Sequence, residues 1–298
     1  MYDAIIIGAG PAGLQAALTL GRMHRSALLL DSGEYRNGAV AHMHNMIGAD
    51  GMPPAELRAK ARGELGAYAG IEIRDVRAES VAGSIDDFAV ALADGTEARA
   101  RRIVLATGIA DDLPAVPGLA DLWGRRAFSC PFCDGHEFRD ARIAVLGASP
   151  RTAHVLGMLQ PIVAEAVVLP IDEQPDADTL ALIATKGGRV HPASVVSVEA
   201  QGDGVRVRTA DGDVEAAGIF VAAGTMRQRA PFAAQLGLQL ADSGAILIDE
   251  FGRTSLPGVS AAGDLAHRAS LPGPLAAVVQ ASAAGMAAGA GIVQELSA

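Results

Sequence analysis

Two cysteines, Cys130 and Cys133, are the residues whose type and spacing most directly suggest chemistry. They are the only cysteines in the chain, and a C-x-x-C pair can close a small disulfide ring in which one thiol tends to be acidified. A structural zinc site needs four ligands, and the sequence contains neither a second C-x-x-C nor an H-x-x-x-H pair. Two inert buried thiols remain an alternative. The spacing therefore favours a redox-active pair and predicts no bound metal.

His136 lies three residues after Cys133 and is a second candidate for catalysis. An imidazole there could deprotonate a substrate thiol or stabilise a thiolate near neutral pH. The alternative is a surface or packing histidine.

The first 31 residues contain a phosphate-binding pattern. An apolar strand is followed by the run Gly8-Ala9-Gly10-Pro11-Ala12-Gly13, and Asp31 stands at the end of the next strand. Glycines allow a tight turn and a close backbone approach, the helix that follows offers unpaired N–H groups to a pyrophosphate, and the acid can accept hydrogen bonds from ribose hydroxyls. The pattern predicts a bound dinucleotide and leaves FAD and NAD open.

Alternating strand and helix patterns predict an α/β protein. Apolar strands at residues 5–7 and 27–30 flank a helix at 11–23, and the same order returns at 143–146, 152–159 and 166–169. Between these units we expect a helix at 53–68, antiparallel strands at 71–81 and 88–92 with a turn at Asp94-Gly95, and a strand at 103–106. The repetition predicts two related dinucleotide-binding, Rossmann-like domains.

The composition excludes several kinds of partner. A formal net charge of −10 would repel a phosphate backbone, so we expect no nucleic acid. The N-terminus enters a strand pattern without a cationic region or cleavage site, which favours a cytoplasmic protein. The stretch at 270–290 is rich in Ala and Gly and contains Pro272, Pro274 and Gln280, which indicates a buried helix and no membrane span.

Two further segments extend the pattern into a family resemblance. Ala106-Thr107-Gly108 and Ala261-Ala262-Gly263-Asp264 resemble the second and third FAD-contact segments of flavoproteins with two dinucleotide-binding folds. With the cysteine motif, they make the chain similar over its whole length to the low-molecular-weight thioredoxin reductases. The resemblance implies FAD as cofactor, a homodimer, an FAD-binding domain at 1–113 and 230–298, and an inserted NADPH-binding-like domain at 114–229 that carries the cysteines.

The same resemblance implies roles for single residues. Cys133 would face the flavin, Cys130 would exchange with the substrate, and Asp134 would be the general acid/base, unless Asp134 only caps the next turn. Asp264 would bind the ribityl chain, and the helix near Ala277 would approach the pyrimidine edge of the flavin. The expected FAD-binding residues are Gly8, Gly10, Pro11, Ala12, Gly13, Asp31, Arg36, His44, Asn45, Thr107, Gly108, Gly263, Asp264 and Ala277.

The second glycine turn departs from the family pattern. Ser149 places a side chain where the backbone should approach a pyrophosphate, and Pro150 removes an N–H group. The strand that follows ends in Leu169-Pro170-Ile171-Asp172-Glu173-Gln174, with two acids where the family has arginines for the 2′-phosphate of NADPH. We expect NADPH binding to be lost. A degenerate site rescued by Arg151 or Arg189 is the alternative.

This combination resembles a subgroup, the thioredoxin-reductase-like dithiol oxidases. The run Cys-Pro-Phe-Cys-Asp-Gly-His-Glu and the segment Ala41-His42-Met43-His44-Asn45 carry that resemblance. Such enzymes use oxygen to close disulfides in small microbial metabolites such as epidithiodiketopiperazines and dithiolopyrrolones. The resemblance implies a small-molecule dithiol and oxygen as partners. The alternatives are a disulfide reductase fed by NAD(P)H or a ferredoxin-like donor, and a non-catalytic flavin-binding redox sensor.

Overall fold

A computed structural model of the chain describes residues 1–171, 174–273 and 275–298. The contacts divide it into two compact units. Unit 1 comprises Met1–Gly38, Pro54–Ala110 and Arg227–Ala298, and unit 2 comprises Ala39–Pro53 and Asp111–Met226. The domain boundaries predicted from the sequence differ from these units mainly at residues 39–53, because the prediction places them in the FAD-binding domain. These residues group with unit 2 because Ala39 packs against Gly124 and His44 lies beside Glu137.

Unit 1 is built on a seven-stranded sheet in the order β3-β2-β1-β6-β5-β4, with β18 also paired to β6. The strands are β1 (Tyr2–Ile7), β2 (Ala27–Leu30), β3 (Ile71–Arg74), β4 (Ala78–Ser84), β5 (Asp87–Leu92), β6 (Glu97–Leu105) and β18 (Val259–Ala261). The second half of β6 pairs in parallel with β1 and β18, while its first half pairs antiparallel with β5. One long strand thus joins a parallel dinucleotide-binding sheet to an antiparallel hairpin.

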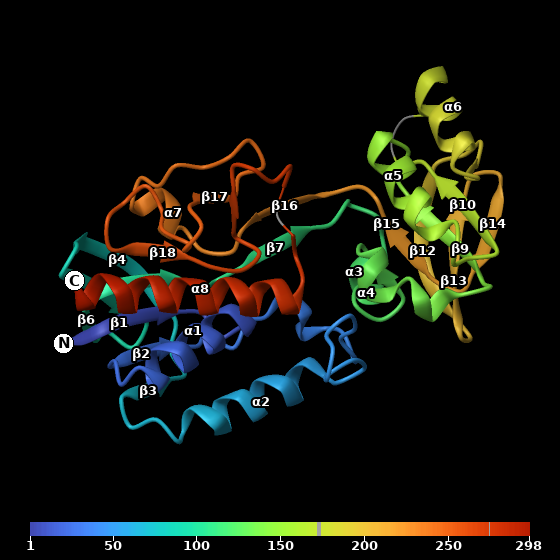
Figure 1. Ribbon diagram of the computed structural model, residues 1–298. Helices are drawn as coiled ribbons and strands as arrows, with labels where there is room; N and C mark the ends of the chain where they lie inside the picture. The colour runs from blue at the N-terminus through green and yellow to red at the C-terminus, as the bar shows by residue number, and fades with distance from the viewer. Residues whose placement is uncertain (172–173, 274) are drawn as a thin grey trace. The chain divides into compact units, whose positions relative to one another are not determined.

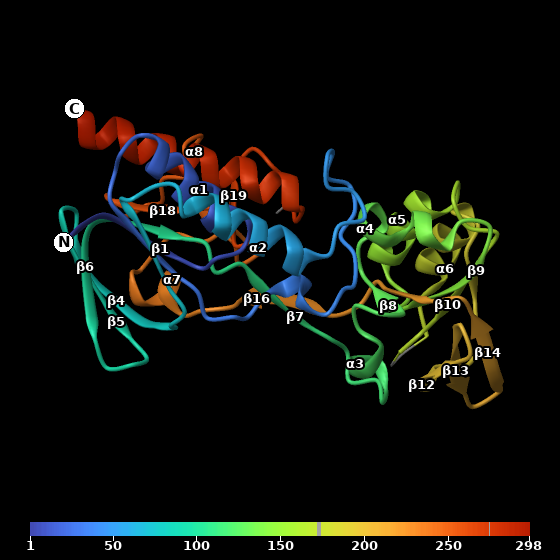
Figure 2. The same cartoon turned by 90° about the horizontal axis from the view of Figure 1, so that it is seen from below.

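Alternation along β1 divides the apolar residues of unit 1 between two cores. Ile5 and Ile7 face the hairpin strands, whereas Ala4 and Ile6 face α1 (Pro11–Arg22) and α8 (Val278–Ser297). Figures 1 and 2 show α1 and α8 side by side. A Cβ atom at Gly285 would stand 2.0 Å from the Ala12 carbonyl oxygen, so the two helices approach closely only because this residue is glycine. Each fully buried Ile or Leu contributes roughly 1.5–3 kcal/mol to such cores.

The single strand predicted at 71–81 was wrong. The chain forms β3 at one edge of the sheet and β4 at the opposite edge, because β3 pairs in parallel with β2 whereas β4 pairs antiparallel with β5. The turn at Asp94 and Gly95 joins β5 to β6, and Gly95 takes a positive φ of 81° there. Unit 1 also contains η1 (Arg36–Gly38), α2 (Pro54–Leu65), α7 (Phe232–Gln235), β17 (Ile246–Ile248) and β19 (Ala266–Arg268).

Unit 2 repeats the parallel arrangement on a smaller scale. Its sheet has the order β11-β10-β9-β15-β8, and its strands are β8 (Ala127–Phe128), β9 (Arg142–Leu146), β10 (Glu165–Leu169), β11 (Arg189–Val190) and β15 (Ile219–Val221). One face packs on α5 (Pro150–Leu159) and α6 (Ala177–Thr185), and the other on an antiparallel meander of β12 (Val195–Gln201), β13 (Gly204–Thr209) and β14 (Gly212–Ala216). The predicted α/β class with two Rossmann-like folds is confirmed.

Two paired strands, β7 (Ile109–Asp112) and β16 (Thr225–Gln228), carry the chain between the units. The remaining short helices of unit 2 are α3 (Leu119–Leu122), α4 (Pro131–Asp134) and η2 (His136–Phe138). Among the helices that the structure describes, none has the length and apolar character needed to cross a bilayer.

Candidate functional site

The first glycine turn follows β1, and its backbone geometry fits a pyrophosphate. Gly8 has a φ of 111°, and a Cβ atom there would stand 2.4 Å from the Ala106 carbonyl oxygen. A Cβ atom at Gly13 would collide with the Gly8 carbonyl oxygen, whereas one at Gly10 would meet no atom within 4 Å. Gly8 and Gly13 therefore allow close packing of the backbone, and Gly10 leaves open space that a pyrophosphate could approach. Pro11 begins α1, where its missing N–H group is not needed.

Asp31 is buried at the end of β2 and is already held by protein groups. Its carboxylate accepts hydrogen bonds from the Gly33 amide (2.9 Å), the Tyr35 hydroxyl (2.5 Å) and Arg62 (2.7 Å). Burial and the hydrogen bond to Asp31 raise the pKa of Tyr35 to about 12. The Arg58 guanidinium lies 3.8 Å from the centre of the Tyr35 ring. That Asp31 contacts a ribose stays a prediction. The sequence analysis does not predict that Tyr35 and Arg62 fix the orientation of the Asp31 carboxylate.

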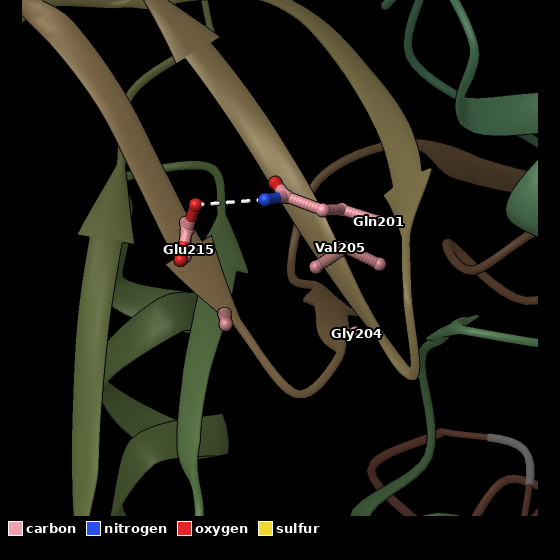
Figure 3. Close-up of a pocket in the computed structure, with 5 residues that line it drawn as sticks. Gln201, Gly204, Val205 and Glu215 are labelled. Atoms are coloured by element: carbon pink, nitrogen blue, oxygen red, sulfur yellow. Dashed lines mark hydrogen bonds between the residues drawn. The ribbon is translucent and has the colours of Figure 1, made fainter.

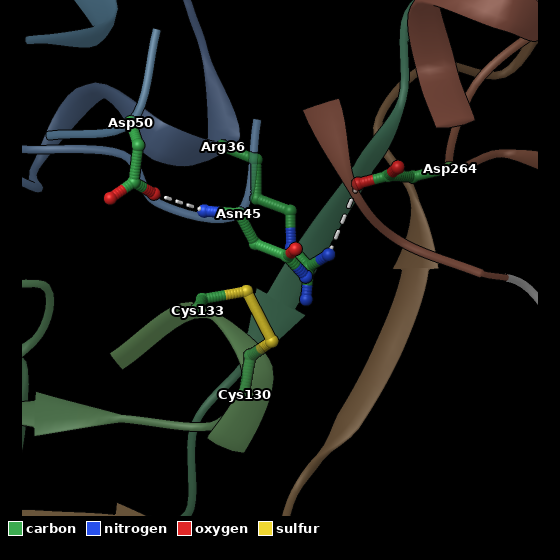
Figure 4. Close-up of a disulfide and its surroundings, with 6 residues drawn as sticks. All are labelled: Arg36, Asn45, Asp50, Cys130, Cys133 and Asp264. Carbon is green, nitrogen blue, oxygen red and sulfur yellow. Dashed lines mark hydrogen bonds and ion pairs between the residues drawn. A yellow bond between two sulfur atoms is a disulfide. The ribbon is translucent and has the colours of Figure 1, made fainter. Parts of the chain in front are cut away.

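The two other predicted FAD segments follow β6, which pairs with β1, and β18, which pairs with β6. Thr107 and Gly108 come after β6, Gly263 and Asp264 come after β18, and both strands are parallel to β1 or to each other. Carboxyl ends of parallel strands share one edge of a sheet, where nucleotides bind in such folds. Arg36 contacts Asp264 through an ion pair of 3.1 Å (Figure 4). Ala277 caps the start of α8. The residues present in unit 1 therefore fit FAD.

Replacing Asp264 with alanine is expected to weaken FAD retention. A hydrogen bond to a charged group is worth about 1.5–3 kcal/mol, so the dissociation constant should rise roughly tenfold to a hundredfold. FAD binding to the apoprotein, followed by flavin fluorescence, measures this. Asp242→Ala, at an exposed acid of the same unit, is the control. Equal affinity in both variants would show that Asp264 does not contact the cofactor.

The cysteine pair of unit 2 forms a disulfide at the start of α4 (Figure 4). The Cα atoms of Cys130 and Cys133 are 5.3 Å apart, and the amides of Cys133 and Asp134 donate to the Cys130 carbonyl oxygen at 3.2 and 3.1 Å. A Cβ atom at Gly135 would stand 2.5 Å from the Pro131 carbonyl oxygen and 3.2 Å from Leu159. Gly135 thus lets the cysteine turn pack against α5.

Asp134, directly after Cys133, has an unusual environment. Burial and repulsion from Glu137 raise the pKa of its carboxyl group to about 7, and attraction to His44 opposes that rise. A group with such a pKa can accept and release protons at neutral pH. Glu137 was not predicted as a site residue. The sequence signal was available, because Glu137 lies one helical turn after Asp134.

His44 lies 3.7 Å from both Glu137 (through Nε2) and Asp50 (through Nδ1). Asn45 takes a left-handed φ of 62°, and its amide donates to the Asp50 carboxylate at 2.7 Å, as Figure 4 shows. Both residues belong to unit 2. Their contact with the flavin stays a prediction. His136 is exposed on η2, and its catalytic role stays a prediction. His44 is a histidine that contacts acids of this unit, Asp50 and Glu137.

Polar groups of the second glycine turn form hydrogen bonds with one another. The Thr152 hydroxyl accepts from the Ser149 amide at 3.1 Å and donates to the Gly147 carbonyl at 3.0 Å, and Pro150 has no amide N–H. Arg151 donates to the Gly224 carbonyl at 3.2 Å, and Arg189 pairs with Glu165. The acids predicted to repel a 2′-phosphate, Asp172 and Glu173, lie outside the described residues.

One surface pocket of unit 2 lies away from the cysteines along the chain. Its cavity of about 330 Å³ is lined by Gln201, Gly204, Val205, Glu215 and Ala216, and Figure 3 shows the hydrogen bond between Gln201 and Glu215. These residues offer no nucleophile or redox group. Within residues 1–171, 174–273 and 275–298 no cluster of His, Cys, Asp and Glu could hold a metal ion.

Comparisons with known proteins agree with this geometry. A family model described as pyridine nucleotide-disulphide oxidoreductase matches residues 2–285. Thioredoxin reductase sirT of Leptosphaeria maculans is 33% identical, with 98% of this chain and 93% of that protein aligned. A probable thioredoxin reductase of Arthroderma benhamiae is 42% identical over 152 residues, which span only 38% of its own length. The crystal structure of an oxidoreductase from Agrobacterium tumefaciens is 34% identical with a TM-score of 0.89, covering 99% of this chain and 98% of that chain.

Proposed function

The chain belongs to the pyridine nucleotide-disulphide oxidoreductase family, and from this premise we propose that it is an FAD-dependent dithiol oxidase acting on a small-molecule dithiol. The observation that carries the proposal is the second glycine turn, whose Ser149 amide is used internally and whose next residue, Pro150, has none. A turn with fewer available amide donors disfavours a nicotinamide dinucleotide. The cysteine pair is then the entry point for electrons.

The cysteines carry out thiol–disulfide exchange. A substrate thiolate attacks Cys130, the Cys130–Cys133 bond breaks, and Cys133 leaves as a thiolate. The second substrate thiol then attacks the mixed disulfide, which releases a cyclic disulfide and leaves both cysteines reduced. Two electrons and two protons leave the substrate in each cycle. When bound, FAD would take up the electron pair and pass it to oxygen, giving hydrogen peroxide.

Asp134 handles protons in this scheme. Its carboxylate accepts the proton of the attacking substrate thiol, and a pKa of about 7 lets it release that proton to solvent or to the Cys133 thiolate. Gly8, Gly10, Arg36 and Asp264 would hold the cofactor. The resemblance to thioredoxin reductases supports a homodimer as part of the proposal.

Oxygen uptake with a panel of thiols tests the function. Dithiothreitol and other vicinal or bridging dithiols should support oxygen consumption with one peroxide per disulfide formed. The monothiol 2-mercaptoethanol is the matched control and should be much slower, because resolution by a second molecule lacks the high effective concentration of an attached thiol. Oxygen uptake that depends on NADPH and not on the dithiol would reject the proposal in favour of a disulfide reductase.

A further inference from the structure

The two carboxylate oxygens of Asp31 are used unequally. Oδ1 accepts one hydrogen bond, from the Gly33 amide at 2.9 Å. Oδ2 accepts two hydrogen bonds, from the Tyr35 hydroxyl at 2.5 Å and from the Arg62 guanidinium at 2.7 Å. An ionised carboxylate offers about four acceptor sites, two on each oxygen. Among the residues that the structure describes, the contacts of Asp31 therefore fill Oδ2 and leave one acceptor site on Oδ1.

Both donors to Oδ2 are themselves held in place. Arg62 lies in the last turn of α2, and its second terminal nitrogen donates to the Asp75 carboxylate at 2.7 Å. The Arg58 guanidinium, one turn earlier on α2, lies 3.8 Å from the centre of the Tyr35 ring. Arg58 also donates to the side-chain oxygen of Asn37 at 3.2 Å. Donors that are supported in this way keep a fixed direction, so they do not readily give up their acceptor to a ligand.

The remaining acceptor site lies next to the first glycine turn. The Gly8 amide donates to the Leu30 carbonyl at 2.9 Å, and Leu30 directly precedes Asp31 at the end of β2. A Cβ atom at Gly10 would meet no atom within 4 Å, so the turn leaves space for a ligand. In such folds, the acid at the end of the second strand meets the ribose of a dinucleotide that lies on the turn. Asp31 is only 4% exposed, which limits the directions from which a ribose can approach it.

We propose that Asp31 binds the adenosine ribose of FAD through Oδ1 and one hydroxyl only, while Tyr35 and Arg62 are positioning residues that occupy Oδ2. The proposal rests on the FAD-dependent function proposed above, because it takes FAD as the ligand. An acid with both oxygens free could accept both neighbouring ribose hydroxyls, one at each oxygen. Here the second hydroxyl finds no open acceptor on Asp31, so it adds nothing to the affinity through this residue.

FAD analogues that lack either the 2′- or the 3′-hydroxyl of the adenosine ribose test this count. One analogue should bind the apoprotein about tenfold to a hundredfold more weakly than FAD, and the other should bind within about threefold of FAD. Quenching of flavin fluorescence measures the three dissociation constants. Asp31→Ala should abolish the difference between the analogues. In the wild type, an equal loss with both analogues, or a loss with neither, would overturn the inference.

The role of Arg62 is tested by exchanging its donor. Arg62→Met opens an acceptor site on Oδ2, so the second hydroxyl can bind there, and both analogues should then bind more weakly than FAD. Arg62→Lys keeps a charged donor at the same helix position and should restore the loss with one analogue only. Arg99→Met is the matched control, because it breaks the exposed pair with Asp87 and should keep the wild-type pattern. An equal loss of affinity for FAD and both analogues in Arg62→Met would contradict the positioning role.

Failure of this inference and failure of the proposed function give different results. A loss with one analogue only would support the inference even if no dithiol were oxidised. Dithiol oxidation by an FAD-loaded protein that loses affinity equally for both analogues would overturn the inference while the proposed function stands. An apoprotein that binds none of the three flavins would reject FAD as the cofactor and the inference with it.

Discussion

Replacing Cys130 with serine is expected to stop dithiol-dependent oxygen uptake, with a loss of at least about a thousandfold. The hydroxyl of serine cannot form a disulfide, so the substrate thiolate has no sulfur to attack. The Cys130–Cys133 bond and Asp134, the proposed proton acceptor, lie in one short turn, and no other cysteine in the sequence can substitute. The rate is measured with an oxygen electrode and by peroxide release.

The partner cysteine gives a different phenotype. Cys133→Ser should retain a thiol at Cys130 that accumulates a mixed disulfide with an oxidised substrate, visible as added mass in the intact protein. FAD content must be equal in all variants, and Ser129→Ala serves as the neighbouring control. Rates in Cys130→Ser equal to the wild type would mean that thiols reach the flavin directly, and the exchange mechanism would be wrong.

Micromolar NADPH is expected to leave the flavin oxidised under anaerobic conditions, at rates at least about a hundredfold below those with a dithiol. Losing even one or two charge-assisted contacts of about 1.5–3 kcal/mol each is enough for that difference. Such contacts require free amide donors, and the Ser149 amide already donates to the Thr152 hydroxyl. Stopped-flow absorbance of the flavin band measures both rates, and readmission of air should restore the oxidised spectrum after reduction by the dithiol.

Rapid flavin reduction by NADPH would contradict this expectation and favour the reductase. Arg151 would then be the residue to examine, since its guanidinium reaches only the Gly224 carbonyl among the contacts described for it. In that case Arg151→Ala should raise the Michaelis constant for NADPH more than that for NADH, because only NADPH carries the 2′-phosphate.

Local patterns predicted the parts of the fold that local forces decide. The strand, glycine turn and helix at residues 2–22 were predicted within a few residues, because period-two burial and the turn glycines act over short distances. The pairing of Cys130 with Cys133 and the position of Asp134 followed from adjacency in the same way. The split of residues 71–81 into β3 and β4 could not be predicted in this way, since the segment contains no Gly or Pro to mark a break and only sheet order places the two strands at opposite edges.

The site shows the same limit. A catalytic role of His136, the histidine nearest the cysteines in sequence, stays a prediction, whereas the contact of His44 with Glu137 was not predicted. Nothing local to residues 39–53 indicates that they pack with residues 111–226. Likewise, the contact of Asp31 with Arg62 depends on how α2 packs, which the sequence around Asp31 does not reveal.

The grouping of residues 39–53 with unit 2 has a consequence for recombination. The chain passes between the two units at four places, after residues 38, 53, 110 and 226, so the inserted unit is not one continuous stretch of gene. A crossover that exchanges only residues 111–226 between relatives would transfer the cysteines and both neighbouring acids but leave their histidine behind. Chimeras of this family should therefore exchange residues 39–53 and 111–226 together.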